Sequence, residues 1–303
     1  MRTARGRRAA IPYAFLSPAI VLFVLFLLLP IGYTAYLSLR KVQVSGLGLG
    51  AGARREVFAG LENYRVAVGD SDLWWGMVRV LVYGGILLPA MLGLALLFAL
   101  LLDARRVGAR RFSRLAIFLP YAVPGVIATL LWGFLYLPQV SPFQRALREL
   151  GVGTVDLMGP TTIYGALVNI ALWGGVGFNM IVIYTTLRAI PAELYESARI
   201  DGASETQIAL RIKIPLVTPA IILTSVFSII ATLQVFSEPT TLSPLTNSIP
   251  SDFTPLMKIY RDAFARNDIY SAAASSIVVA ALTLTVSFGL LWVLQKRAFG
   301  QER

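Results

Sequence analysis

One polar stretch, residues 192–219, combines several carboxylates with a glycine in a chain that is otherwise mostly apolar. Glu196 can pair with an arginine of another protein or cap a helix N-terminus there, because a carboxylate binds both. Gly202 can adopt a positive φ without steric penalty, so it can end one short helix and turn the chain. Ser204 suits the N-cap of a second helix, which Pro215 would end or kink. The stretch therefore predicts two short helices joined by a glycine turn, a compact knob that fits a socket on another protein.

The residue order of this stretch resembles the EAA loop of the membrane-spanning subunits of bacterial ABC importers, in their carbohydrate-uptake branch. The resemblance rests on Ile190-Pro191, Glu193-Leu194-Tyr195-Glu196, Ala198, Asp201-Gly202-Ala203-Ser204, Gln207, Ile212 and Pro215. Ser197 stands where the family has a second alanine, and Thr206 and Ala209 replace a frequent aromatic pair. The alternative is a generic amphipathic loop between two membrane helices.

In that family the loop is a coupling helix that seats in a cleft of the cytoplasmic ATPase. The resemblance implies that residues 188–216 form the coupling segment of this chain. We name them the predicted coupling segment. The residues it implies for contact with an ATPase are Glu193, Glu196, Ser197, Ala198, Asp201, Gly202, Ala203 and Pro215.

The composition is that of an integral membrane protein. The chain has 303 residues, of which 56% are hydrophobic and only 14% charged, and its mean hydropathy is +0.70; soluble domains carry roughly 25% charged residues. Cysteine and histidine are both absent. This composition excludes disulfides, thiol catalysis, the commonest general base and the commonest metal ligands, and we predict neither catalytic residues nor a metal site.

The apolar runs predict an all-α protein with six transmembrane helices. The first run, 11–39, follows a basic N-terminus at 1–10 and is longer than the ~7–15 residues of a signal-peptide core, so we read it as an uncleaved span bent near Pro30. Residues 40–76 would form an external loop, and residues 77–303 a five-helix permease core. Within the core, the spans are expected at 77–102, 115–137, 162–187, 217–236 and 272–294, with a cytoplasmic tail at 295–303.

The charges predict that both termini are cytoplasmic. With the N-terminus inside, most lysines and arginines fall on internal segments and most carboxylates on external ones, as the positive-inside rule requires. This orientation places the predicted coupling segment in the cytoplasm. The net charge of +11 is then explained by topology and by contact with anionic membrane lipid, without any nucleic-acid partner.

Weaker features along the chain resemble the same family. They are the pattern Phe58-x-Gly60-x-x-Asn63-Tyr64, the prolines Pro120 and Pro124 inside the third span, and Thr254-Pro255. The chain departs from the family where Ser141-Pro142-Phe143-Gln144 replaces a Gly-x-x-Asn pattern and where Ser243-Pro244-Leu245 replaces Gly-Gly-Pro.

The resemblance implies a type I ABC importer permease bundle in a bacterial inner or plasma membrane. It also implies three partners: a second homologous permease subunit, an ATPase dimer that binds Mg-ATP, and an extracytoplasmic substrate-binding protein. This chain itself would hold no cofactor. It has no G-x-x-x-x-G-K-[ST] pattern, so ATP hydrolysis by the P-loop route requires a separate polypeptide.

Uncharged polar residues in the fourth and fifth spans are candidates for a translocation path. Asn, Ser and Thr can bind substrate hydroxyls, and aromatic rings can stack on sugar faces; the alternative role is interhelical hydrogen bonding, worth ~0.6 kcal/mol per bond. A sugar, oligosaccharide, polyol or sugar/glycerol-phosphate-type solute would suit such a path. The candidates are Asn169, Trp173, Phe178, Asn179, Ser225, Ser228 and Thr232.

Two other functions stay open at this point. An ion-coupled secondary transporter would need titratable groups at membrane depth, and the interiors of the six predicted spans contain no Asp or Glu. A structural membrane scaffold would not need the predicted coupling segment at all.

Overall fold

The computed structural model describes residues 13, 15–44, 54–104, 108–151 and 153–299. The predicted basic terminus at 1–10 and the end of the predicted tail, 300–303, lie outside this part of the chain. The described chain divides into two compact units. One comprises the described residues up to Leu73 with Ile259–Ala281, and the other comprises the described residues of Trp74–Lys258 with those from Leu282 onward.

The predicted membrane protein is confirmed: the described chain is mostly helical and contains five helices that are long and apolar enough to cross a membrane. A sixth span is obtained if one bent helix pair, Arg110–Ala122 with Gly125–Tyr136, counts as a single crossing. The five are Phe15–Ser38, Ser71–Asp103, Ile163–Ala189, Glu205–Leu233 and Ile269–Gly289.

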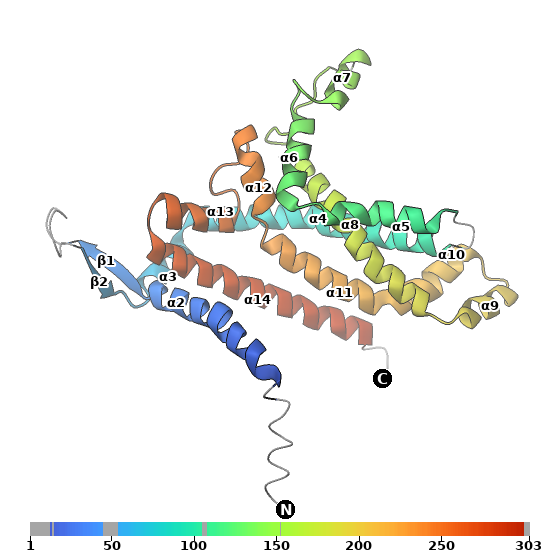
Figure 1. Ribbon diagram of the computed structural model, residues 1–303, viewed down its shortest axis with the longest axis horizontal. Coiled ribbons are helices and arrows are strands. Elements are labelled where there is room, and N and C mark those ends of the chain that lie inside the picture. Colours follow the sequence, from blue (N-terminus) through green and yellow to red (C-terminus); the bar gives the residue numbers. More distant parts are fainter. Residues whose placement is uncertain (1–12, 14, 45–53, 105–107, 152, 300–303) are drawn as a thin grey trace, which may run out of the picture. The chain divides into compact units, whose positions relative to one another are not determined.

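The first unit begins with the helix Phe15–Ser38, whose second part is α2 (Leu29–Ser38). The segment expected as an external loop then forms an antiparallel hairpin of β1 (Arg40–Val44) and β2 (Arg54–Phe58), in which Arg40 pairs with Phe58, and the helix α3 (Glu62–Gly69) (Figure 1).

The Phe58–Tyr64 pattern fastens this hairpin to the first helix. Gly60 makes the turn with a φ of +57°. The buried Asn63 donates from Nδ2 to the carbonyl of Ser38 at 2.8 Å and to that of Arg40 at 2.7 Å, and the Tyr64 hydroxyl lies 2.7 Å from Ser38 Oγ. The Asn63 side chain thus provides hydrogen-bond donors for two backbone carbonyls at the junction between the first helix and β1.

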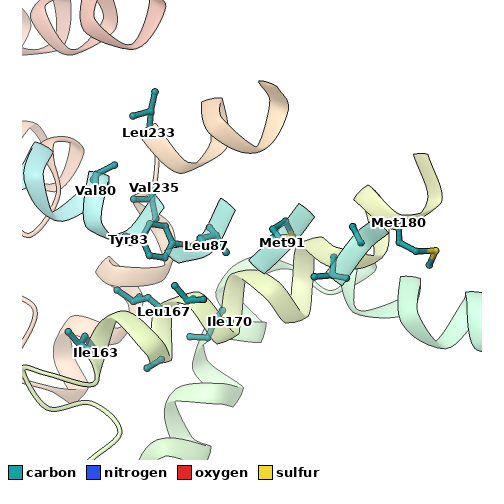
Figure 2. Close-up of a cluster of buried hydrophobic side chains, with 14 of the residues drawn as sticks. Val80, Tyr83, Leu87, Met91, Ile163, Leu167, Ile170, Met180, Leu233 and Val235 are labelled. Atoms are coloured by element: carbon teal, nitrogen blue, oxygen red, sulfur yellow. The ribbon is translucent and has the colours of Figure 1, made fainter. Parts of the chain in front are cut away.

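The second unit is built around two long helices, α4 (Ser71–Asp103) and α8 (Ile163–Ala189). Every fourth residue of α4 from Tyr83 to Ala99 is buried, because residues four apart share one face of a helix. Figure 2 shows this face of α4 beside Leu167 and Ile170 of α8. The remaining helices of this unit are α5 (Arg110–Phe118), α6 (Gly125–Tyr136), α7 (Pro142–Glu149), α9 (Ala192–Ile200), α10 (Glu205–Ile208), α11 (Ile214–Leu233) and α12 (Ser237–Leu242).

The structure changes the expected third span, 115–137. In place of one kinked helix there are two segments bent by 97°, with a 3-10 turn (Leu119–Ala122) ending the first. The physical reason is Pro124, which disfavours a helical conformation at Val123 and leaves that residue extended with ψ of 128°.

The helix also does not end at Pro215, contrary to one of the two expectations. A π-helical segment, Ala209–Lys213, directly precedes it, and the chain continues as α11. A second π-helical segment, Val24–Leu28, precedes Pro30 in the same way. Proline has no N–H and its ring clashes with the preceding turn, so one wider turn lets the helix continue. As a result, the second short helix of the predicted coupling segment runs without a break into α11.

The outer parts expected as loops carry short helices. Gln144 of α7 replaces the asparagine of the family pattern, and its buried amide bonds Val155 in both directions, donating at 2.5 Å and accepting at 3.0 Å. The last part of the chain holds α13 (Pro255–Tyr260) and α14 (Ile269–Phe299), so the predicted sixth span falls within a longer helix.

Candidate functional site

The predicted coupling segment has the expected helix-turn-helix form. Gly202 turns the chain with a φ of +84°. The amide of Ala203 donates to the Ala198 carbonyl at 2.9 Å and that of Gly202 to the Arg199 carbonyl at 3.0 Å. These two bonds form a Schellman motif, which satisfies the free carbonyls at the end of α9. The turn is therefore fixed by backbone bonds.

The second helix starts with a capping box, as Ser204 predicted. The Ser204 hydroxyl accepts from the Gln207 amide, and the Gln207 side chain accepts from the Ser204 amide at 2.8 Å. Across the turn, Arg199 binds both carboxylate oxygens of Glu205, with Nε 2.7 Å from Oε1. That hydrogen bond raises the pKa of Arg199 above its ordinary value. These bonds join α9 to α10.

One face of α9 is exposed and carries three of the eight predicted contact residues. Glu193, Glu196, Ser197 and Ile200 are all exposed, and their spacing of three and four places them on one stripe of the helix. We name these four residues the α9 stripe. Ile200 is 86% exposed. Ile200 was not among the contact residues predicted from the sequence. Its apolar character and its helical spacing from Glu193, Glu196 and Ser197 could have identified it. Ile200 thus adds an apolar side chain to a stripe that otherwise carries two carboxylates and a hydroxyl.

The other predicted contact residues lie off this stripe. Asp201 and Gly202 are exposed in the turn, Ala198 and Ala203 are half-buried beneath it, and Pro215 is exposed on α11.

A buried ion pair anchors the predicted coupling segment to the end of α4. Lys213 Nζ lies 2.5 Å from Asp103 Oδ2, and both side chains are less than a tenth exposed. Arg188, at the end of α8, lies 3.7 Å from the other carboxylate oxygen. The Lys213 ammonium also lies 5.0 Å from the centre of the Tyr195 ring of α9. One carboxylate thus connects the ends of three helices, an arrangement that the sequence analysis did not identify.

The environment of Tyr195 follows from this cluster. Burial, together with the negative charge of Asp103, raises the pKa of its phenol. Its hydroxyl is buried and has no hydrogen-bond partner within the described part of the chain. Tyr195 therefore stays uncharged and presents its aromatic ring to the Lys213 ammonium.

A cavity of about 500 Å³ lies in the second unit, between α4, α6, α8, α11 and α12. Tyr121 and Phe178 form one wall, stacked with their ring centres 5.0 Å apart. Polar groups come from both α8 and α11. The described lining residues with polar side chains are Tyr83, Tyr121, Asn179, Ser228, Thr232, Gln234, Ser237 and Glu238.

The structure brings four of the seven predicted path residues to this cavity: Phe178, Asn179, Ser228 and Thr232. Asn179 donates from Nδ2 to the Gly175 carbonyl at 3.0 Å, and its Oδ1 accepts from Ser228 at 3.4 Å. The bond to Gly175 stays within α8 and orients the amide beside the cavity, while the bond from Ser228 links α11 to α8.

The other three predicted path residues are elsewhere. Asn169 lines a second cavity of about 460 Å³, where it donates to the Tyr136 hydroxyl at 2.8 Å. Trp173 packs edge-on against Trp132, and Ser225 is buried and donates to its own helix at Ile221. Neither Trp173 nor Ser225 is among the described lining residues of the two cavities. Ser225 and Ser228 share one broad face of α11, but side chains three residues apart still differ in direction by about 60°, and only Ser228 reaches the cavity.

Two glycines of α8 have different surroundings. A Cβ on Gly177 would lie 2.7 Å from the Phe118 Cα, so this glycine allows the backbone of α5 to approach closely. Gly174 has nothing within 4 Å of such a Cβ and lines the cavity instead.

Comparison with known proteins identifies this architecture. Residues 91–299, more than half of the chain, match the model of the family "Binding-protein-dependent transport system inner membrane component". The chain belongs to this family. It is thus an inner-membrane permease subunit of an ABC importer, and we refer to it as the permease.

Two relatives show how far the similarity extends. The permease is 28% identical over 287 residues to the sn-glycerol-3-phosphate transport system permease protein UgpA of Salmonella choleraesuis (strain SC-B67), covering 91% of each chain. It is 26% identical over 293 residues to the protein of the same name from Brucella abortus biovar 1 (strain 9-941), covering 95% of each.

Two solved structures share its fold. One is a chain of a bacterial ABC transporter involved in the import of the acidic polysaccharide alginate, with a TM-score of 0.82, 22% identity and coverage of 98% of the permease and 99% of that chain. The other is the alginate transporter in complex with an alginate pentasaccharide-bound periplasmic protein, with a TM-score of 0.80, 22% identity and coverage of 94% and 93%.

Proposed function

We propose that the permease carries a sugar, oligosaccharide, polyol or glycerol-phosphate-type solute inward, and that ATP hydrolysis by a separate ATPase drives the step through the predicted coupling segment. The observation that carries the proposal is a direct connection. α8 leads into α9, and α10 continues into α11, while α8 and α11 both line the 500 Å³ cavity, to which they bring Asn179, Ser228 and Thr232. A force on the segment therefore acts on two walls of the cavity at once.

Several interactions brace the segment so that it can transmit such a force. Its turn is closed by the Schellman bonds, its two helices are joined by Arg199 and Glu205, and the Asp103–Lys213 pair ties it to α4. Packed elements held at several points move as one body and do not bend individually.

The α9 stripe is the surface that we assign to the ATPase. Glu193 and Glu196 supply two carboxylates for arginine partners, and Ile200 supplies an apolar anchor. The complete importer would contain an ATPase dimer that binds Mg-ATP, a second homologous permease subunit and an extracytoplasmic binding protein. The permease itself would hold no cofactor and catalyse no reaction, with both termini in the cytoplasm.

The testing experiment is affinity purification of the permease from its native membrane in mild detergent, followed by mass spectrometry. We expect a P-loop ATPase and a second permease to co-purify with the wild type, and the ATPase to be lost or weakened with Glu196→Ala. The matched control is Glu149→Ala, an exposed glutamate on α7. A chain that purifies alone, or an ATPase retained equally by both variants, contradicts the proposal.

Uptake in the presence of an ionophore separates the proposal from ion-coupled transport. The importer should continue to work when the ionophore collapses the ion gradients while ATP stays high. An ion-coupled carrier would stop at once.

A further inference from the structure

The one charged side chain among the described lining residues of the 500 Å³ cavity is negative. Glu238, in the first turn of α12, contributes a carboxylate to its lining. Among the described lining residues there is no lysine or arginine, and the chain has no histidine. A ligand in this cavity therefore faces a negative charge and no positive one from the described lining.

Two hydroxyls of the cavity lining, those of Thr232 and Ser228, already use their hydrogens within the protein. Thr232 donates its hydroxyl hydrogen to the Ser228 carbonyl at 2.7 Å, and Ser228 donates to Asn179 Oδ1 at 3.4 Å. One hydrogen of the Asn179 amide is used on Gly175. The oxygens of Thr232 and Ser228 keep lone pairs, and a carboxylate such as Glu238 only accepts. Toward these oxygens a ligand must donate hydrogen bonds, whereas the hydroxyls of Tyr83, Tyr121 and Ser237 and the Gln234 amide can either donate or accept.

We propose, resting on the proposed function, that the cavity of the permease selects uncharged polyhydroxylated solutes and that Glu238 excludes anions from it. Hydroxyl groups donate to the carboxylate and to the free oxygen lone pairs, and the stacked rings of Tyr121 and Phe178 offer a flat apolar wall to a sugar ring. Phosphate and carboxylate groups are negatively charged when ionised, so Glu238 repels them and no lysine or arginine of the described lining compensates.

Electrostatics strengthens the exclusion. Much of the cavity wall is apolar, including Leu87, Met91, Phe227 and Val235. Charges interact more strongly beside such a wall than in bulk water, because the local dielectric constant is lower. Within the proposed range of solutes, this favours the sugars and polyols over the phosphate-bearing compounds.

The natural absence of cysteine allows a direct test in the full-length permease, in permeabilised membranes that contain its partners. Ser228→Cys and Gln234→Cys each place one thiol at the cavity. Their reaction rates are measured with two methanethiosulfonate reagents of similar size, one bearing a trimethylammonium group and one a sulfonate. Each rate is divided by that of the same reagent with free 2-mercaptoethanol.

The normalised rate for the cationic reagent should exceed that for the anionic one by about tenfold. Adding Glu238→Gln should bring this ratio down to about a third or less, and Glu238→Lys should invert it. The control thiol is Thr161→Cys, in the second cavity, whose described lining has no charged residue. Its ratio should not respond to Glu238.

Equal rates for the two reagents, or a ratio that Glu238→Gln leaves unchanged, would overturn the proposal. So would a lack of reaction at both cavity positions with both reagents, since the cavity would then be closed to solutes. The result is independent of the coupling assignment. If Glu196→Ala left uptake intact while the thiol rates behaved as expected, the proposed function would fail and the charge selectivity of the cavity would stand.

Discussion

Lys213 Nζ and Asp103 Oδ2 lie 2.5 Å apart in the permease, although 110 positions separate the two residues in the chain. Asp103 ends α4, and Lys213 ends the π-helical turn before Pro215. The pair therefore fixes the predicted coupling segment to a helix whose Tyr83, Leu87 and Met91 line the cavity.

We expect Asp103→Asn to destabilise the permease more than Lys213→Met. Asp103→Asn leaves Lys213 buried without a counter-ion, and breaking such a pair from one side costs roughly 3–5 kcal/mol. In Lys213→Met the carboxylate keeps Arg188 at 3.7 Å. Thermal unfolding in detergent measures both variants. The control is Lys41→Met, which removes the exposed pair of Lys41 with Glu62 and should cost about 0–1 kcal/mol. Equal losses for all three variants would contradict the anchoring role.

Glu196→Ala should abolish transport while leaving the permease folded in the membrane. Its carboxylate is exposed on the α9 stripe, so its loss removes a contact with the ATPase and little intramolecular packing. Uptake of the natural solute, measured with the amount of protein in the membrane, tests this. Normal uptake by this variant would contradict the assignment of Glu196 to ATPase coupling. Glu149→Ala, on α7, should transport like the wild type.

Gly202→Pro should also abolish transport, and Gly202→Ala should impair it. The φ of +84° is closed to proline, and it costs other residues about 1–2 kcal/mol. Nothing lies within 4 Å of an added Cβ, so the cost comes from the backbone alone. Gly202→Asn should therefore retain more uptake than Gly202→Ala. Gly165→Ala, also in open space but within a helix, is the control and should be neutral or slightly stabilising.

Gly177→Ala and Gly174→Ala should differ, although the two residues are three apart on α8. The Cβ that Gly177→Ala adds would meet the backbone of α5 at Phe118, and overpacking of this kind costs typically about 1–3 kcal/mol. Gly174→Ala meets nothing within 4 Å and should leave the melting temperature unchanged or slightly raised, because alanine favours a helix more than glycine does. Thermal unfolding of the two variants side by side is the measurement, and similar curves would show that the helices separate easily.

Tyr195→Phe should leave stability at neutral pH unchanged or slightly higher, because the removed hydroxyl is buried and has no hydrogen-bond partner within the described residues. Burial raises the pKa of this phenol in the folded state. As the pH rises through the ordinary tyrosine range, the unfolded chain loses the proton first, so stability falls. Melting temperatures between about pH 8 and 11, which bracket the ordinary tyrosine pKa, should therefore decline less steeply in Tyr195→Phe. An unchanged slope would show that Tyr195 does not titrate in this way.

The sequence by itself determined the class of the permease and the local form of the predicted coupling segment. Composition and apolar runs require a helical membrane protein. The turn at Gly202 and the capping box at Ser204 follow from interactions among residues within a few positions of each other, so their spacing predicts them.

Only the tertiary structure decided which distant residues meet. The Asp103–Lys213 pair has no spacing signal, because it joins two helices that lie far apart in the sequence. Contacts between distant helices also decide which predicted path residues of the fourth and fifth spans line the cavity. Asn179, Ser228 and Thr232 reach it, while Trp173 and Ser225 pack elsewhere. Helical periodicity shows which residues share a face, and the packing of neighbouring helices decides whether that face meets protein or open space.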